Sequence, residues 1–248
     1  MEQRKAMRIR GEEDIFGETV IIGGIQKVSL IDYPGKISAI IFTRGCTFRC
    51  PYCHNSQLVL PNLFQDPIPE EEVIDFLQSR RKFLDAVVIT GGEPTLQKDL
   101  LQFMKRIKDM GYLVKLDSSG IFPDVLERAI KEKLVDYMAM DIKAPFEKYA
   151  LVVGANPDMK NIRRSVDIIM HSGIDYEFRT TVVKSQLSKG DIAEIARSIS
   201  GSKRYFLQKF VNSNTLDQSF GAEETYTDKE FECMSEVIRD YVSSCSVR

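Results

Sequence analysis

Short apolar runs alternate with amphipathic segments along most of the chain. The first of these runs, residues 37–43, is β-branched, as buried parallel strands are. The apolar runs predict strands at residues 37–43, 86–90, 112–116, 135–140, 176–183 and 204–210. The segments between them carry apolar residues at helical spacing and predict helices at residues 70–81, 98–110, 123–131, 162–170 and 192–199. This alternation predicts an α/β fold of right-handed βαβ units around a parallel sheet. Either an open doubly wound sheet or part of a (βα) barrel satisfies the pattern.

The two ends of the chain depart from this alternation. Residues 1–19 mix basic and acidic groups with few apolar ones, which predicts a flexible tail before a single domain at residues 20–248. Residues 20–30 predict an edge strand. Towards the other end, the polar residues 212–227 predict a mobile loop, and a capping-box sequence then opens a final helix.

The composition is that of an ordinary globular protein, with 248 residues of which 43% are hydrophobic and 28% charged. A formal charge of −2 provides no general attraction to nucleic acid or to an anionic membrane. No apolar run approaches the ~20 residues that span a bilayer, and the first residues lack the apolar centre of a signal peptide. We therefore expect a cytoplasmic protein that binds neither nucleic acid nor membranes.

Three of the five cysteines lie close together, directly after the strand at residues 37–43. Cys46, Cys50 and Cys53 have the spacing Cys-x-x-x-Cys-x-x-Cys. Three thiols without a fourth nearby suit a soft metal centre that keeps one coordination position free. The other two, Cys233 and Cys245, are expected on the final helix as packing residues.

Part of the cysteine loop also fits three other kinds of site. Cys50-Pro51-Tyr52-Cys53 matches the dithiol of glutaredoxins, and Cys50-x-x-Cys53-His54 matches the attachment motif of c-type haem. A zinc site of the three cysteines and His54 is a further alternative, although adjacent residues rarely reach one tetrahedral ion. All three alternatives leave the remaining polar groups at the strand ends without a role.

A polar or glycine-rich group lies in or directly after the last part of each later predicted strand. They are Gly91-Gly92-Glu93-Pro94, Asp117-Ser118-Ser119-Gly120, Asp141-Ile142-Lys143, Arg179-Thr180-Thr181 and Gln208-Lys209. Because the carboxyl ends of parallel strands meet at one edge of the sheet, these groups and the cysteines predict a single site. Glu93 can pair with an amino group and Lys143 with a carboxylate, which suits an amino-acid ligand.

The cysteine loop, with Tyr52 before its last cysteine and Gly91-Gly92-Glu93-Pro94 one strand later, resembles that of the radical S-adenosylmethionine (SAM) superfamily. The run 29–55, with its Asp-Tyr-Pro-Gly and Cys-His-Asn flanks, is similar to the glycyl-radical-enzyme activases, above all those of anaerobic ribonucleoside-triphosphate reductase. The resemblance implies a partial (βα)6 TIM-type barrel. It also implies a [4Fe-4S] cluster on Cys46, Cys50 and Cys53, with SAM on the fourth iron.

The implied reaction is the reductive cleavage of SAM to a 5′-deoxyadenosyl radical, which takes a hydrogen atom from a backbone glycine of the partner enzyme. A flavodoxin- or ferredoxin-type protein would donate the electron. The cofactor-binding residues implied by the resemblance are Tyr52, Cys53, His54, Gly91, Gly92, Glu93, Ser118, Asp141, Lys143, Arg179 and Gln208. Asp117 and Asp141 correspond to carboxylates that hold a monovalent cation, and Asp32 to a contact with the partner's glycine loop.

One departure from the family bears on the choice of partner. Pyruvate formate-lyase activases place a histidine near the end of the sixth strand, where this chain has Gln208 or Lys209. The resemblance therefore favours the reductase type or another activase. A radical SAM enzyme that acts on a small molecule, such as a deazapurine precursor, is a second hypothesis, and a zinc-binding module is the non-enzymatic one.

Overall fold

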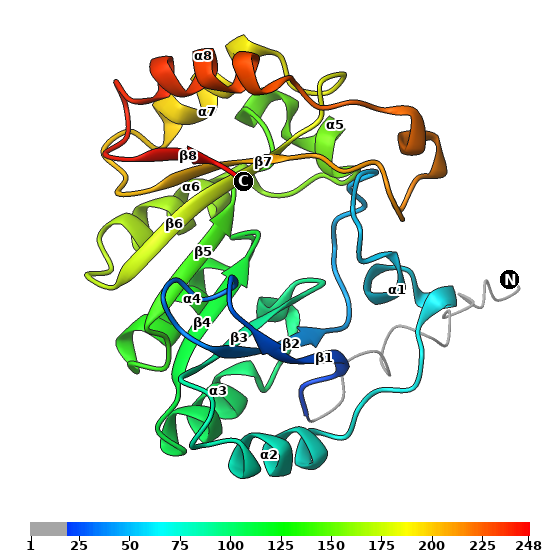
Figure 1. The fold of residues 1–248 in the computed structure, drawn as a ribbon, viewed down its shortest axis with the longest axis vertical. Coiled ribbons are helices and arrows are strands. Elements are labelled where there is room, and N and C mark those ends of the chain that lie inside the picture. The colour runs from blue at the N-terminus through cyan, green and yellow to red at the C-terminus, as the bar shows by residue number, and fades with distance from the viewer. Residues whose placement is uncertain (1–18) are drawn as a thin grey trace, which may run out of the picture.

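The computed structural model describes residues 19–248, so the tail expected at residues 1–19 lies almost wholly outside the described residues. Among the described residues, the strands form one sheet (Figure 1). They are β1 (Ile22–Ser29), β2 (Ser38–Thr43), β3 (Ala86–Gly91), β4 (Leu113–Ser118), β5 (Tyr137–Asp141), β6 (Asp175–Val182), β7 (Tyr205–Lys209) and β8 (Cys245–Val247). β1 pairs antiparallel with β2, and every later pair of neighbours is parallel.

Helices connect the parallel strands and lie around the outside of the curved sheet (Figure 1). The α-helices are α1 (Ser56–Val59), α2 (Glu70–Ser79), α3 (Leu100–Asp109), α4 (Pro123–Lys131), α5 (Tyr149–Val153), α6 (Met159–Met170), α7 (Lys189–Ser198) and α8 (Asp228–Ile238). Short 3-10 helices are η1 (Pro61–Leu63), η2 (Pro94–Leu96), η3 (Phe146–Lys148) and η4 (Gln218–Ala222). The alternation of strands and helices expected from the apolar pattern is confirmed.

The strand order decides between the two architectures that the sequence left open. The strands lie in the sheet in the same order as in the chain, from β1 to β8. A doubly wound sheet reverses its order at a switch point, whereas a barrel adds each strand on the same side of the last. The fold is therefore a partial barrel, and β1 and β8 form the edges of its sheet in the described part of the chain.

The two faces of the sheet belong to two separate apolar clusters. Val87 and Ile89 of β3 join the main hydrophobic core beneath the helices. Ala86 and Val88, on the opposite face, join a small apolar cluster inside the barrel with Tyr33, Ile40 and Tyr137. This inner cluster fills the end of the barrel at which the parallel strands begin. Polar side chains occupy the other end of the same inner face.

The C-terminal segment differs from the sequence prediction. The capping box of Thr227 and Glu230 is present and α8 follows it, but the helix ends at Ile238. Cys245 therefore lies in β8 and not on the helix, which corrects its predicted place. The serine-rich residues 243–246 have low helix propensity, and their backbone pairs with β7 instead.

The polar residues 212–227, expected to be a mobile loop, make defined contacts. The backbone N–H groups of Leu216 and Asp217 donate to the carbonyl oxygens of Cys53 (2.8 Å) and Pro51 (3.0 Å). The segment 211–217 therefore lies against the cysteine loop, and we call it the strap. Across residues 19–248, none of the helices combines the length and apolar character needed to cross a membrane.

Candidate functional site

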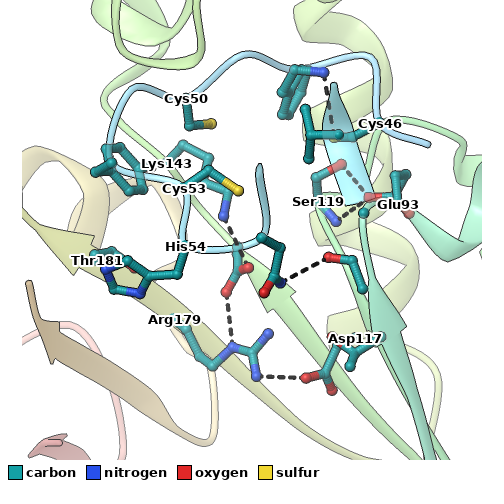
Figure 2. A pocket seen from close by; sticks show the side chains of 18 of the residues that line it. Cys46, Cys50, Cys53, His54, Glu93, Asp117, Ser119, Lys143, Arg179 and Thr181 are labelled. Atoms are coloured by element: carbon teal, nitrogen blue, oxygen red, sulfur yellow. Dashed lines mark hydrogen bonds and ion pairs between the residues drawn. The ribbon is translucent and has the colours of Figure 1, made fainter. Parts of the chain in front are cut away.

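A cavity of about 310 Å³ opens at the carboxyl ends of the parallel strands (Figure 2). Every site residue predicted from the sequence except Asp32 lines this cavity. The predicted residues that line it are Cys46, Cys50, Tyr52, Cys53, His54, Gly91, Gly92, Glu93, Asp117, Ser118, Asp141, Lys143, Arg179 and Gln208. The expectation that the strand ends converge on one site is met by this arrangement.

The cysteine loop supplies three free thiols to the cavity. The guanidinium of Arg49 donates to the carbonyl oxygens of Cys46 and Phe48, both at 2.7 Å, and so fixes the outer side of the loop. Burial raises the pKa of the Cys46 thiol to about 12, and the nearby Glu93 adds to the effect. Burial also raises the pKa of Cys50, against the opposing charge of Lys143. In the metal-free protein these two thiols are therefore protonated at neutral pH.

The two glycines at the end of β3, Gly91 and Gly92, are required by the packing of the β3 turn against the cysteine loop. Gly91 has a φ of +121°, and a Cβ there would lie 2.4 Å from the backbone nitrogen of Thr43. A Cβ on Gly92 would lie 2.1 Å from the carbonyl oxygen of Gly45. The backbone N–H of Glu93 donates to that same oxygen at 2.7 Å. The glycines thus bring the β3 turn directly onto the start of the cysteine loop.

Glu93 is only 1% exposed, and groups of the chain itself occupy both carboxylate oxygens. Oε1 accepts from the backbone N–H of Thr95 (3.1 Å), from the Thr95 hydroxyl and from Ser118 Oγ (2.8 Å). Oε2 accepts from the backbone N–H of Ser119 (2.7 Å) and from Ser119 Oγ (2.5 Å). Figure 2 shows Ser119 facing Glu93 at the edge of the cavity. Glu93 therefore links the ends of β3 and β4.

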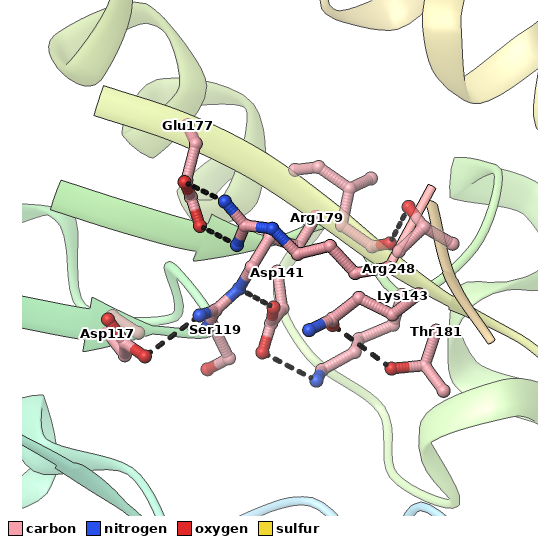
Figure 3. A network of polar contacts seen from close by, with 12 residues as sticks. Asp117, Ser119, Asp141, Lys143, Glu177, Arg179, Thr181 and Arg248 are labelled. Carbon is pink, nitrogen blue, oxygen red and sulfur yellow. Dashed lines mark hydrogen bonds and ion pairs between the residues drawn. The ribbon is translucent and has the colours of Figure 1, made fainter. Parts of the chain in front are cut away.

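A chain of buried ion pairs crosses the floor of the cavity from β4 to β6 (Figure 3). Lys115 pairs with Asp117 at 2.6 Å, and Lys143 pairs with Asp141 at 3.0 Å. Arg179 joins the two halves, with Nη1 2.8 Å from Asp117 and Nε 2.8 Å from Asp141.

These ion pairs keep their members charged. Burial acts to raise the pKa of Asp117 and of Asp141, but their cationic neighbours outweigh it and hold both pKa values below the usual range. Burial acts to lower the pKa of Lys143 and of Arg179, but the carboxylates outweigh it and raise both pKa values well above the ordinary ones. The cavity floor is therefore ionic at neutral pH.

Asp117 and Asp141 do not fit the monovalent cation expected from the sequence. The guanidinium of Arg179 lies between the two carboxylates, and Lys115 and Lys143 each pair with one of them. A metal cation needs oxygen atoms that are not already bound to other cations.

The strap holds His54 at the side of the cavity. His54 Nε2 lies 2.7 Å from the carbonyl oxygen of Val211, and its ring stacks on Phe210 with ring centres 6.1 Å apart. Gln208 and Lys209 both line the cavity, and Gln208 accepts from Thr181 Oγ1 at 3.4 Å.

Asp32, expected to contact the partner's glycine loop, does not line the cavity. It follows β1 in the turn that leads into β2, and its carboxylate accepts from the Ser29 hydroxyl. Ser29 pairs with Ser38 at the beginning of β2, whereas the cysteine loop follows the end of that strand. Since β2 spans roughly 16 Å, Asp32 lies at the opposite end of the barrel from the thiols.

Comparison with known proteins agrees with this geometry. A family model of the radical SAM superfamily matches residues 40–199. The chain belongs to the radical SAM superfamily. A protein of Methanocaldococcus jannaschii assigned to the glycyl-radical-enzyme activating enzymes is 35% identical over 92% of this chain and 95% of its own length.

Two further similarities are more distant. The pyruvate formate-lyase-activating enzyme of Staphylococcus epidermidis is 31% identical over 48% of this chain and 51% of its own length. QueE from Escherichia coli has a similar structure, with a TM-score of 0.55 at 15% identity, over 92% of this chain and 93% of that one. At this identity the structural similarity concerns the fold alone.

As a radical SAM enzyme, the chain uses a [4Fe-4S] cluster and SAM, and the cavity fits both. Its three free thiols are soft ligands for iron, and cationic groups for a carboxylate lie opposite them. The buried hydroxyl of Tyr52, on the cavity wall, has no hydrogen-bond partner among the described residues, as expected beside a ligand. The thiols do not converge on a point that could hold one ion within residues 19–248, and a cluster does not require this because each cysteine binds a different iron.

Two contributors to the radical SAM site were missed from the sequence. Lys115, buried beneath Asp117, was read only as part of a strand, although its place two residues before Asp117 puts both on the inner face. The strap had no local signal, because its contacts with Pro51 and Cys53 join residues more than 150 positions apart.

Proposed function

We propose that this radical SAM enzyme installs a glycyl radical on a partner enzyme, and that the partner is an anaerobic ribonucleoside-triphosphate reductase. The observation that carries the proposal is the 35% identity, over 92% of the chain, to a relative assigned to the glycyl-radical-enzyme activating enzymes. The similarity to a pyruvate formate-lyase-activating enzyme supports the same class of reaction over about half of the chain, 48%.

The choice of partner rests on Gln208. Pyruvate formate-lyase activases have a histidine in this region, whereas Gln208 offers the cavity an uncharged amide that cannot act as an acid or base near neutral pH. This difference favours the reductase over pyruvate formate-lyase. We expect a small one-electron carrier of the flavodoxin or ferredoxin type as the donor.

Cys46, Cys50 and Cys53 would bind the cluster and leave its fourth iron for the amino and carboxylate groups of SAM. When bound, the two cofactors supply the means to remove one hydrogen atom from the partner's glycine. Lys143 would bind the carboxylate of SAM through its ammonium group, which faces the cavity beside Asp141. Arg179 has N–H groups beyond the two bound to aspartates, and these could reach the same carboxylate.

The remaining residues would orient the cofactor. The amino group of SAM would approach Glu93, where it must share the carboxylate with the hydroxyls of Ser118 and Ser119. Tyr52 and His54 would border the adenine, with His54 held in place by the strap. Burial of the cavity floor would exclude water from the reacting atoms.

The test combines the reconstituted enzyme, SAM and a reductant with purified anaerobic ribonucleoside-triphosphate reductase, in the absence of oxygen. We expect methionine, 5′-deoxyadenosine and a glycyl-radical signal in the electron paramagnetic resonance spectrum of the reductase. A reductase variant with alanine in place of the acceptor glycine is the matched control and should give no such signal.

The other outcomes separate the competing hypotheses. A radical on pyruvate formate-lyase, and not on the reductase, would change the partner but keep the activase function. Formation of 5′-deoxyadenosine only when a deazapurine precursor is added would identify a small-molecule enzyme. Zinc at one atom per chain, without SAM binding, would refute the radical function altogether.

A further inference from the structure

Arg179 occupies the space between two carboxylates at the floor of the cavity (Figure 3). Its Nη1 and Nε lie 2.8 Å from Asp117 and 2.8 Å from Asp141, so one guanidinium bridges the ends of β4 and β5. The side chains of Arg179 and Asp117 are both only 11% exposed. This is the arrangement that two carboxylates adopt around a shared cation, with the cation supplied by the chain.

The ionic side chains paired around Arg179 already carry a net positive charge. Asp117 also pairs with Lys115 at 2.6 Å, and Asp141 also pairs with Lys143 at 3.0 Å. Among the described residues the connected group therefore holds three cationic side chains and two carboxylates. A metal cation added here would bring a further positive charge next to the guanidinium in a buried site, which is unfavourable.

The geometry of the guanidinium allows a second contact. Arginine has five N–H donors, and the two aspartates take one on Nε and one on Nη1. The others are available to an anionic group of a ligand in the cavity that Arg179 lines. A metal ion between the carboxylates could balance their charge but could not donate hydrogen bonds.

We propose that Arg179 is the built-in cation of this site, so that the enzyme binds SAM without any monovalent metal cation. The bridge holds the two aspartates, and through them Lys143, in the positions that face the cofactor. The inference rests on the charges of the chain itself and holds whatever the partner enzyme is.

The test substitutes Arg179 and measures whether a potassium ion can then take its place between the two aspartates. Thermal unfolding of the metal-free protein and SAM binding to the cluster-loaded protein are measured in potassium chloride and in choline chloride at equal ionic strength. For the wild type we expect a SAM dissociation constant that changes by less than about twofold and no shift in the unfolding temperature, because no potassium binds.

Arg179→Gln removes the cation and leaves Asp117 facing Asp141. Potassium should then bind between them and stabilise the variant, by about tenfold in the folding equilibrium constant when its concentration is ten times the dissociation constant. SAM binding by the variant should become dependent on potassium as well. Arg204→Gln is the matched control, because Arg204 pairs with Asp175 at the other end of β6 and should give no potassium response.

Two results would overturn the inference. The first is a wild type that loses SAM affinity in choline chloride and regains it with potassium. The second is a folded Arg179→Gln protein that shows no response to potassium. If Arg179→Gln does not fold, Arg179→Lys is used instead. Lysine keeps one positive charge between the aspartates, so SAM binding by this variant should remain independent of potassium. A potassium requirement would refute the proposal.

Discussion

Replacing Glu93 by glutamine tests whether this carboxylate holds the fold as well as the cofactor. The carboxylate accepts from two backbone N–H groups, those of Thr95 at 3.1 Å and Ser119 at 2.7 Å, one on each oxygen. Glutamine has only one acceptor oxygen. In either orientation of the amide, its NH₂ group faces one of these buried N–H groups, which is then left without a partner.

The cost follows from the number of affected bonds. A buried donor without a partner costs about 1–3 kcal/mol, and each bond to the remaining oxygen weakens because its acceptor is no longer charged. The lower cost of burying a neutral amide offsets part of this loss. We expect Glu93→Gln to lower the free energy of unfolding of the metal-free protein by about 3 kcal/mol, or its unfolding temperature by roughly 10 °C.

The assay is thermal and urea unfolding of the metal-free protein, followed by circular dichroism. Glu71→Gln is the matched control, because the Glu71 side chain is 74% exposed and pairs with Arg106 at the surface, where an ion pair contributes little to stability. If Glu93→Gln unfolds within about 2 °C of the wild type, the structural role of this carboxylate is refuted and Glu93 acts on the cofactor alone.

Three further substitutions test the cysteine loop and its surroundings. Cys50→Ala should prevent iron binding during reconstitution but cost only about 1 kcal/mol of stability, and unfolding of the whole protein would instead indicate a structural metal. Lys143→Ala should weaken SAM binding about tenfold with the iron content unchanged, and loss of iron would show that Lys143 is misplaced. Gly92→Ala should reduce cluster incorporation and cost about 3 kcal/mol, because its Cβ would lie 2.1 Å from the Gly45 carbonyl oxygen; Gly221→Ala, with nothing within 4 Å, should do neither.

The alternation of strands and helices and most of the cavity could be predicted from the sequence because both depend on local patterns, whereas the barrel was implied only by the family resemblance. Short apolar runs mark the strands, and the residues at their carboxyl ends must meet at one edge of a parallel sheet. The order of the strands within the sheet was not available from these patterns. The final strand was also missed, because the three residues of β8 are too few to show a period and pair with β7 only after α8 has turned the chain back.

The ion-pair partners of individual side chains could not be predicted from the sequence. Arg179 is expected among the cofactor-binding residues, but its pairing with Asp117 and Asp141 could not be foreseen. Spacing along the chain shows that these residues share a face of the sheet, but not how their charges are paired. For Asp32 the resemblance implies a contact with the partner, and the pairing of Ser29 with Ser38 puts its turn at the end of β2 away from the cysteine loop.

The cysteine loop itself is held by the backbone of three separate segments. The β3 turn binds it through the N–H of Glu93 to the carbonyl oxygen of Gly45, and α5 accepts the N–H of Arg49 through Val153 at 2.8 Å. The strap donates to Pro51 and Cys53. Because each of these bonds involves main-chain atoms, the loop keeps its course even where side chains differ. A site that must orient both a cluster and its ligand benefits from such support, since misplacement by about 1 Å is costly for catalysis. The strap therefore supports the cysteine loop from outside, although none of its residues lines the cavity.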